Sequence, residues 1–300
     1  MTVAASKLTL GPVLYNWPAE KKRDFYFRIA DEAPVNVVYI GEVTCSKRAP
    51  FFSPYIPEVC ERLEQAGKEV VLSSLALIMT ARERNELRAL TSESPWQTEA
   101  NDLSAINLLR GEKHVVGPFV NVYNEGTLEY FYRAGATRVV LNCELPSASI
   151  SELGKAAKGR ELEVQVYGRL PLALSARCYH ARFHNLSKDG CQYVCELDPD
   201  GMDVRTLDDT AFLAVNGTQT MSYTVNSLLS ELETLKNFGI THFRIWPHNT
   251  DMVEIARIFR DTLDGHDDRE NFQRLLRKTK SIAPLSNGFF HATEGFRMVE

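Results

Sequence analysis

The chain has 300 residues, of which 44% are hydrophobic and 24% charged, ordinary values for a globular protein. This length suffices for one large α/β barrel or for two ordinary domains. The net charge of −5 at pH 7, with no dominant basic stripe, gives no reason to expect nucleic-acid binding. The N-terminal segment lacks the features of a signal peptide, and no apolar run is long enough to span a membrane. We therefore expect a cytoplasmic protein.

Apolar, β-branched runs alternate with amphipathic stretches along the chain, a pattern typical of βα units around a parallel sheet. Eight runs predict strands, in chain order 8–14, 35–40, 69–75, 96–101, 115–121, 138–141, 162–166 and 242–246. Helices are predicted between and after them, at 18–30, 57–67, 80–90, 103–110, 126–134, 149–157, 222–238 and 251–263. Gly67, Gly135 and Gly239 each follow a predicted helix, where a left-handed residue commonly ends the helix.

Eight strands with helices between them predict a (β/α)8, TIM-like barrel, formed as a single domain over residues 1–300. An open doubly wound sheet is the alternative. No Gly-x-Gly-x-x-Gly follows the first strand, so a dinucleotide-binding half is not supported. Residues 167–241 separate the seventh and eighth strands, far more than a βα crossover needs, and we expect an insertion there. Within it, residues 211–220 predict a short strand or hairpin.

Three of the six cysteines, Cys178, Cys191 and Cys195, lie close together in that insertion. In a reducing cytosol, clustered thiols bind metal or take part in catalysis more often than they form structural disulfides. Four thiolates can hold a tetrahedral Zn²⁺ or a 4Fe–4S cluster, and the spacing favours neither. Barrel enzymes gather their site residues at the C-terminal ends of the strands. Cys45, after the second strand, and Cys143, after the sixth, are therefore both candidates for the fourth ligand.

Two histidines, His180 and His184, follow Cys178 closely. Histidine is a common metal ligand, but we expect these two to make supporting hydrogen bonds from a solvated loop. Cys60 lies on a predicted amphipathic helix, and we expect it to be structural.

Polar residues at several strand ends complete a candidate pocket. Glu42 follows the second strand, Asn101 the fourth, Asn121 the fifth and Glu144 the sixth. A carboxylate at such a position can act as acid or base when it is partly desolvated. Each of these residues is equally typical of a helix N-cap, and Asp102 especially so.

Several segments of the chain resemble those of a known family. They are Leu10-Gly11-Pro12-Val13-Leu14, Gly41-Glu42-x-x-Cys45-Ser46-Lys47-Arg48, Ser175-Ala176-Arg177-Cys178 and Asn216-Gly217-x-Gln219-Thr220. They are similar to the UbiV family of the collagenase-like peptidase-type superfamily, which takes part in oxygen-independent ubiquinone biosynthesis. The resemblance covers about residues 8–247.

This resemblance implies a barrel-like fold and a 4Fe–4S cluster held by Cys45, Cys178, Cys191 and Cys195. It also implies a heterodimer with UbiU and a lipid-binding accessory protein that presents the hydrophobic substrate. The implied reaction is hydroxylation of a polyprenyl-phenol ring without dioxygen, with prephenate as the expected oxygen donor.

Other functions are less well supported by the sequence. We find no convincing Ser/His/Asp or Cys/His arrangement for a peptidase, and a metal-bound thiolate is not free to attack a peptide. The Cys-x₃-Cys-x₂-Cys pattern of radical S-adenosylmethionine enzymes is absent. The main alternative is a peptidase-type barrel protein with a structural 4Fe–4S cluster or zinc ion and no catalysis of its own.

Overall fold

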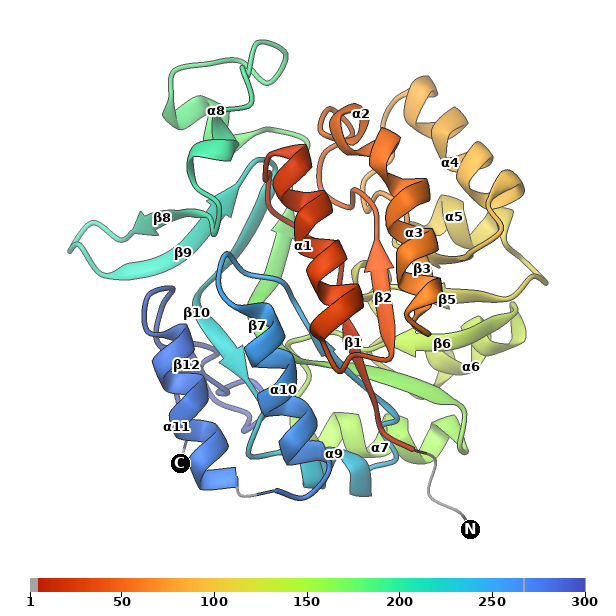
Figure 1. The fold of residues 1–300 in the computed structure, drawn as a ribbon, viewed down its shortest axis with the longest axis vertical. Coiled ribbons are helices and arrows are strands. Elements are labelled where there is room, and N and C mark those ends of the chain that lie inside the picture. The colour runs from red at the N-terminus through yellow and green to blue at the C-terminus, as the bar shows by residue number, and fades with distance from the viewer. Residues whose placement is uncertain (1–4, 267, 300) are drawn as a thin grey trace.

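Eight parallel strands close into a barrel in the computed structural model, which describes residues 5–266 and 268–299. The ring closes because the last of these strands pairs in parallel with both the first and the seventh. In ring order the strands are β1 (Lys7–Leu10), β2 (Val37–Ile40), β3 (Glu69–Ser73), β4 (Gln97–Ala100), β5 (His114–Val116), β6 (Ala136–Val140), β7 (Glu161–Leu174) and β11 (His242–Ile245). The predicted TIM-like barrel is confirmed (Figure 1).

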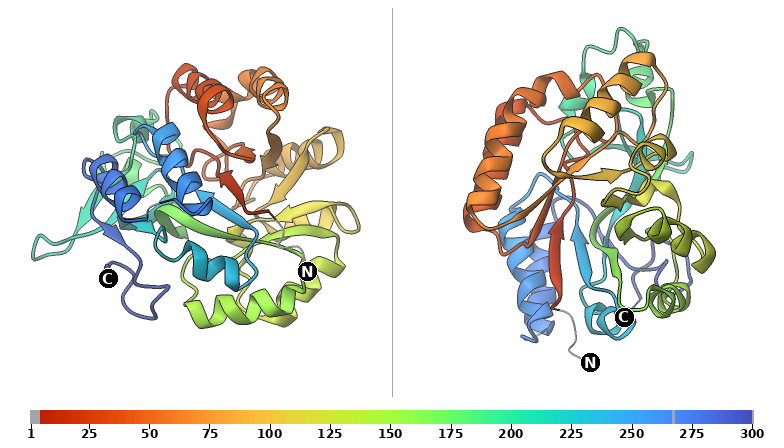
Figure 2. Two further views of the ribbon diagram at one scale, coloured as in Figure 1. Left: turned by 60° about the horizontal axis from the view of Figure 1, so that its bottom comes forward. Right: turned by 90° about the vertical axis from the view of Figure 1, so that its right-hand side faces the viewer.

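Helices surround the outside of the barrel (Figure 2). Seven of the predicted helices are present: α1 (Ala19–Glu32), α3 (Ile56–Gln65), α4 (Ala81–Glu93), α5 (Leu103–Leu108), α6 (Glu125–Arg133), α7 (Ser147–Ala157) and α10 (Met252–Leu263). A short α2 (Ala49–Phe52) continues through the 3₁₀ helix η1 (Ser53–Tyr55) to α3. Gly67, Gly135 and Gly239 have the left-handed φ values predicted for them, +76°, +114° and +88°. In the described part of the chain, no helix is both long and apolar enough to cross a membrane.

Two predicted strands end earlier than their apolar runs suggested. β1 stops at Leu10, before Gly11 and Pro12, and β5 stops at Val116. Residues Pro118–Val120 form the 3₁₀ helix η2 instead of the last part of a strand. Proline has no backbone N–H to donate to a sheet, and this explains why both strands stop short of a proline.

The predicted helix over residues 222–238 is wrong in its first part and correct near its end. Residues Gln219–Ser227 form strand β10, and only Leu232–Asn237 are helical, as α9. Strand β10 pairs with the C-terminal part of β7 and with β9 (Ala211–Asn216), so tertiary pairing overrides the local helical pattern. The hairpin predicted at 211–220 is confirmed by the β9–β10 pair.

The chain between β7 and β11 builds a sheet extension beside the barrel (Figure 1). Strand β7 continues past the ring and pairs antiparallel with β10, which is followed outward by β9 and β8 (Met202–Arg205). The same stretch contains α8 (Tyr179–Phe183) and the 3₁₀ helix η3 (Val194–Leu197). After α10 the chain forms α11 (Asp268–Thr279) and the short strand β12 (Leu285–Ser286), which pairs with β10.

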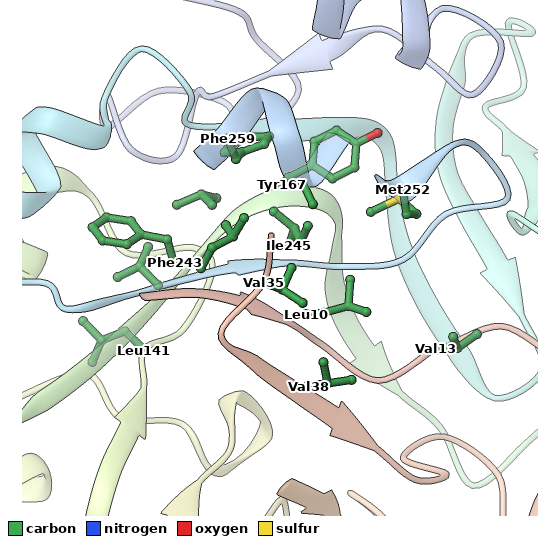
Figure 3. Close-up of a cluster of buried hydrophobic side chains, with 14 of the residues drawn as sticks. Leu10, Val13, Val35, Val38, Leu141, Tyr167, Phe243, Ile245, Met252 and Phe259 are labelled. Carbon is green, nitrogen blue, oxygen red and sulfur yellow. The ribbon is translucent and has the colours of Figure 1, made fainter. Parts of the chain in front are cut away.

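The main hydrophobic core lies between the barrel wall and the helices. Figure 3 shows part of it, with Leu10 and Phe243 from the strands and Phe259 from α10. Successive side chains of a strand point to opposite faces of the barrel wall. Leu8 and Leu10 therefore belong to the hydrophobic core outside the wall, and Thr9, between them, points into the barrel.

Charged side chains occupy part of the barrel interior. Glu163 accepts hydrogen bonds from Thr9 (2.5 Å), Tyr39 (2.6 Å) and Arg244 (2.7 Å), and all four residues are fully buried. Arg138 reaches the same group through Tyr39, at 3.0 Å. Burial raises the pKa of Glu163, but the two guanidinium groups outweigh it and hold the pKa below its usual range. Arg244 also pairs with the buried Glu99 at 2.8 Å, so two cations and two anions neutralise each other in the barrel interior.

Candidate metal centre

Four cysteines that are far apart in the sequence line one small cavity at the C-terminal end of the barrel. Cys45 comes from the loop after β2, Cys178 precedes α8, Cys191 lies in the loop that follows α8, and Cys195 belongs to η3. All four are free thiols. The structure thus brings together the four cysteines that the resemblance implied as ligands.

Cys143 lies elsewhere on the same end of the barrel. Its thiol points toward the carbonyl oxygen of Pro171, at 3.8 Å, and it does not line the four-cysteine cavity. Burial raises the pKa of this thiol to about 12. Sequence spacing alone does not distinguish Cys45 from Cys143 as the fourth member of the group. The geometry favours Cys45.

Local backbone geometry directs three of the thiols toward the cavity. Cys178 caps the N-terminus of α8, where its sulfur accepts a hydrogen bond from the backbone N–H of Ala181 at 3.4 Å. Between Cys191 and Cys195 the chain turns through Gln192 and Tyr193, both in the left-handed region with φ of +49° and +56°. Each such non-glycine residue costs about 1–2 kcal/mol, and strain of this kind is typical of functional sites.

The Cys45 loop is held from two sides by carboxylates. Glu42 accepts hydrogen bonds from the backbone N–H groups of Thr44 and Cys45, each at 3.0 Å. Glu83, on α4, accepts a hydrogen bond from the Ser46 hydroxyl at 2.6 Å. Burial raises the pKa of Glu83, but this bond and those from nearby backbone N–H groups outweigh it and lower the pKa to about 2. Glu42, predicted as a catalytic candidate, therefore positions the cysteine loop.

A buried arginine lies between the Cys45 loop and the sheet extension. Arg48 is 4% exposed and donates to the carbonyl of Leu14 (3.1 Å) and to the side-chain oxygen of Asn216 (2.7 Å). Its guanidinium lines the same cavity as the thiol of Cys195. Gly217 makes room for it, since a Cβ on Gly217 would lie 2.2 Å from the nearer terminal nitrogen.

Asn216 connects the same arginine to the cysteine turn. Its amide nitrogen donates to the carbonyls of Cys195 (2.9 Å) and Asp198 (2.8 Å). The neighbouring Thr218 donates to the carbonyl of Thr44 at 2.9 Å. The tip of the β9–β10 hairpin thus fixes the Cys45 loop against η3. The sequence alone predicts no role for the Asn216-Gly217 segment, because a turn dipeptide does not reveal which residues the turn contacts.

The cavity suits a soft metal centre. Its lining contains four thiols together with Lys47, Arg48 and Lys188, and no carboxylate or histidine among the described residues. Sulfur-only donors favour Zn²⁺ or an iron–sulfur cluster, and the basic groups offset the negative charge of metal-bound thiolates. Burial raises the pKa values of Cys45 and Cys178, so a metal ion would provide the drive to deprotonate them. The residues present therefore fit both predicted centres.

A second cavity, of about 390 Å³, holds two of the four predicted pocket residues, Asn121 and Glu144. Glu144 accepts a hydrogen bond from the Tyr123 hydroxyl, and Asn121 accepts one from the Asn142 amide at 2.9 Å. The side-chain oxygen of Asn142 is buried without a hydrogen-bond partner, so it is free to accept one from a ligand.

Asn101, the fourth of the predicted pocket residues, does not line that cavity. It is buried, and its amide donates to Ser74 and Glu99, each at 3.1 Å. Its position in the packed strand ends gives it a structural role. Asp102 is the N-cap of α5, as predicted, and accepts from the N–H of Ser104 at 2.7 Å.

A third cavity, also about 390 Å³, lies between these two sites. It shares Cys45, Lys47 and Lys188 with the thiol cavity, and it shares Leu77 with the Glu144 cavity. The three cavities therefore form a row across the C-terminal end of the barrel. A larger cavity, of about 1220 Å³, lies at the opposite end, around Glu69 and Glu161. TIM-barrel enzymes carry their chemistry at the C-terminal end, so we locate the site in the row.

The fold and site together define a TIM-barrel protein with a four-cysteine centre at the C-terminal end of the barrel. The chain belongs to peptidase family U32, whose model matches residues 19–300.

Among solved structures, the chain is similar to a dihydropteroate synthase from Thermus thermophilus, with a TM-score of 0.44 and 13% identity over 88% of this chain and 94% of that one. It is also similar to a chain of the tryptophan synthase complex from Pyrococcus furiosus, with a TM-score of 0.43 and 11% identity over 94% and 99%. These scores are too low to support any functional argument.

The family name raises the question of peptidase chemistry. Among the described residues, no serine hydroxyl or cysteine thiol is hydrogen-bonded to a histidine. Ser46 and Ser73 donate instead to Glu83 and Glu99, each at 2.6 Å. In the described part of the chain, the structure thus shows no serine or cysteine paired with a histidine base.

Proposed function

We propose that Cys45, Cys178, Cys191 and Cys195 bind a 4Fe–4S cluster. The observation that carries this proposal is the convergence of all four thiols on one cavity bordered by Lys47, Arg48 and Lys188. The family resemblance supports iron–sulfur over zinc, which the donor set alone does not decide.

The test is anaerobic purification, followed by an absorption spectrum and analysis of iron and sulfide. A broad charge-transfer band with about four iron atoms per chain is expected for a cluster with four thiolate ligands. Cys45→Ala should lose the iron, and Cys143→Ala, the matched control from the same end of the barrel, should keep it. Colourless protein that contains zinc would refute the cluster, and the opposite result for the two variants would refute the ligand assignment.

We further propose that the protein is the iron–sulfur subunit of an oxygen-independent hydroxylase in anaerobic ubiquinone biosynthesis, acting on the polyprenyl-phenol ring. The resemblance over about residues 8–247 supports this substrate, and membership of the U32 family is consistent with it. A cluster with four protein ligands has no open iron position, so when bound it would transfer electrons and would not hold the substrate.

The chain's own residues would bind and orient the reactants in the row of cavities. Asn142, with its free buried oxygen, can accept a hydrogen bond from the phenol hydroxyl, while the Tyr123–Glu144 pair can hold a proton beside the ring. The neighbouring cavity is lined by three basic side chains, Lys47, Arg82 and Lys188, and by two carboxylates, so its lining has a net positive charge that suits an anionic oxygen donor such as prephenate.

The resemblance also supports two partners: UbiU, as the second subunit of a heterodimer, and a lipid-binding accessory protein that presents the substrate. Exposed apolar side chains lie beside the cysteine centre, among them Phe183 (68% exposed) and Leu197 (70%). An exposed apolar group of this kind is typical of a surface that another protein covers.

Activity should be measured in the reconstituted complex with UbiU, without dioxygen, with a polyprenyl phenol as substrate and prephenate as donor. Glu144→Gln should lower hydroxylation by about 10²–10⁴-fold, the usual contribution of a positioned acid or base, and leave the iron content unchanged. The exposed Glu152→Gln serves as the control. Full activity in Glu144→Gln would remove this cavity from the reaction. If the Cys45→Ala complex contains no cluster but keeps full activity, the cluster is not needed for the reaction. That result would favour the alternative of a purely structural metal centre.

A further inference from the structure

We propose a second metal site, formed by His180, His184 and Asp198, that binds a divalent transition-metal ion. One donor atom from each residue, two imidazole nitrogens and one carboxylate oxygen, lies within 4.8 Å of the others. This site is separate from the thiol cavity, since none of the three residues lines that cavity.

His180 provides the strongest evidence for this site. The residue is fully buried, which contradicts the solvated loop expected from the sequence. Its Nδ1 lies 3.4 Å from the carbonyl oxygen of Val215, which can only accept, so this contact favours the neutral tautomer with the proton on Nδ1. A metal-binding histidine almost always donates its other ring N–H in this way.

The other nitrogen of His180 has no hydrogen-bond partner although it is buried. It lies 3.0 Å from a carboxylate oxygen of Asp198, without the geometry of a hydrogen bond. With the proton on Nδ1, two electron-pair donors face each other at this distance. A bound cation would satisfy both, whereas the empty arrangement leaves a costly unpaired polar atom.

His184 completes the group from the next turn of the chain. It stands four residues after His180, at the C-terminal end of α8, so both rings lie on one side of that segment. The two rings are nearly parallel, with centroids 5.5 Å apart and 16° between their planes. The Nε2 of His184 is also buried and without a hydrogen-bond partner.

Two imidazoles and one carboxylate form a donor set that suits Zn²⁺ or Fe²⁺ and is poor for Mg²⁺ or Ca²⁺, which prefer oxygen. The side chain of Asp198 is 34% exposed, so water can complete the coordination. An ion here would link α8, which Cys178 caps, to the residue that follows η3, which contains Cys195. It would therefore hold two segments of the cysteine centre together without binding any thiol.

The test is equilibrium dialysis of Co²⁺ against the anaerobically purified protein. The native chain should bind one more equivalent of Co²⁺ than His184→Ala, whether or not the thiols hold a cluster. This extra equivalent should show d–d absorption without a sulfur-to-cobalt charge-transfer band, because no thiolate is involved. His266→Ala, at an exposed histidine outside the group, should behave as the native chain does.

Asp198→Asn provides a second variant whose partly exposed side chain makes misfolding a smaller concern. It should weaken Co²⁺ binding at least about tenfold, since even residues that only support a metal ligand contribute 10–100-fold to affinity. Equal Co²⁺ stoichiometry in the native chain and in His184→Ala would overturn the proposal. So would a charge-transfer band on the extra equivalent. Neither result bears on the four-cysteine cluster, which is assayed by iron and sulfide.

Discussion

Gly217→Ala should destabilise the protein through a clash with the buried Arg48 and through backbone strain. A Cβ at this position would lie 2.2 Å from a terminal nitrogen of Arg48. The arginine side chain is 4% exposed and is held by hydrogen bonds to Leu14 and Asn216, so it cannot move aside without breaking them. The residue also has φ of +72°, where any side chain is strained.

Two terms set the size of the effect. The left-handed conformation costs alanine about 1–2 kcal/mol relative to glycine. Loss of one charge-assisted hydrogen bond from Arg48 adds about 1.5–3 kcal/mol. Gly67→Ala isolates the first term, because Gly67 has nearly the same φ, +76°, and an added Cβ there would meet nothing within 4 Å. We expect Gly217→Ala to be less stable than Gly67→Ala by about 2 kcal/mol.

The assay is urea unfolding of the native chain and both variants, all prepared in the same cluster state and compared by the free energy of unfolding. Iron content gives a second readout, since Gly217 lies in the wall of the thiol cavity and Gly67 ends α3 on the outside of the barrel. We expect Gly217→Ala to bind less iron and Gly67→Ala to bind the native amount. Equal stabilities of the two variants would refute the reasoning about Arg48.

Two further predictions concern buried carboxylates. The pKa of Glu83 is about 2 in the folded chain and about 4.5 in an unfolded one, so its contribution to stability is complete above pH 4.5 and is lost as the pH falls toward 2. Glu83→Gln should therefore lose about 2 kcal/mol at pH 7, after allowance for solvent screening, and should flatten the fall in stability below pH 4.5. The free energy of unfolding is measured with urea between pH 5 and pH 3. If it falls as steeply with pH in Glu83→Gln as in the native chain, the prediction is wrong. Glu163→Gln removes the carboxylate between Arg138 and Arg244 inside the barrel. Arg244 keeps the buried Glu99 at 2.8 Å, but one buried positive charge is then left without a buried carboxylate, so the substitution should cost about 3–5 kcal/mol. Thermal unfolding measures this loss of unfolding free energy. A loss below about 1 kcal/mol would show that water reaches the barrel interior.

The sequence was sufficient to predict most of the fold. Each strand–helix unit carries its own apolar period, and the glycines at 67, 135 and 239 mark helix ends, so the barrel followed from local signals. The errors lie where partners distant in sequence decide the structure. Residues 222–227 have a helical pattern but pair with β7, and no local property shows that β7 continues far enough to meet them.

The candidate site divides in the same way. Spacing along the chain is enough to show that three cysteines lie close together and that polar residues follow the strands. Only the tertiary structure brought Cys45 to the other three and left Cys143 apart, and only the structure placed Arg48 against the turn at Asn216. These contacts depend on how loops far apart in the chain fold over one end of the barrel. The physical reason is that a loop's path is fixed by the hydrogen bonds it finds with other loops, and such partners leave no periodic signal in the sequence.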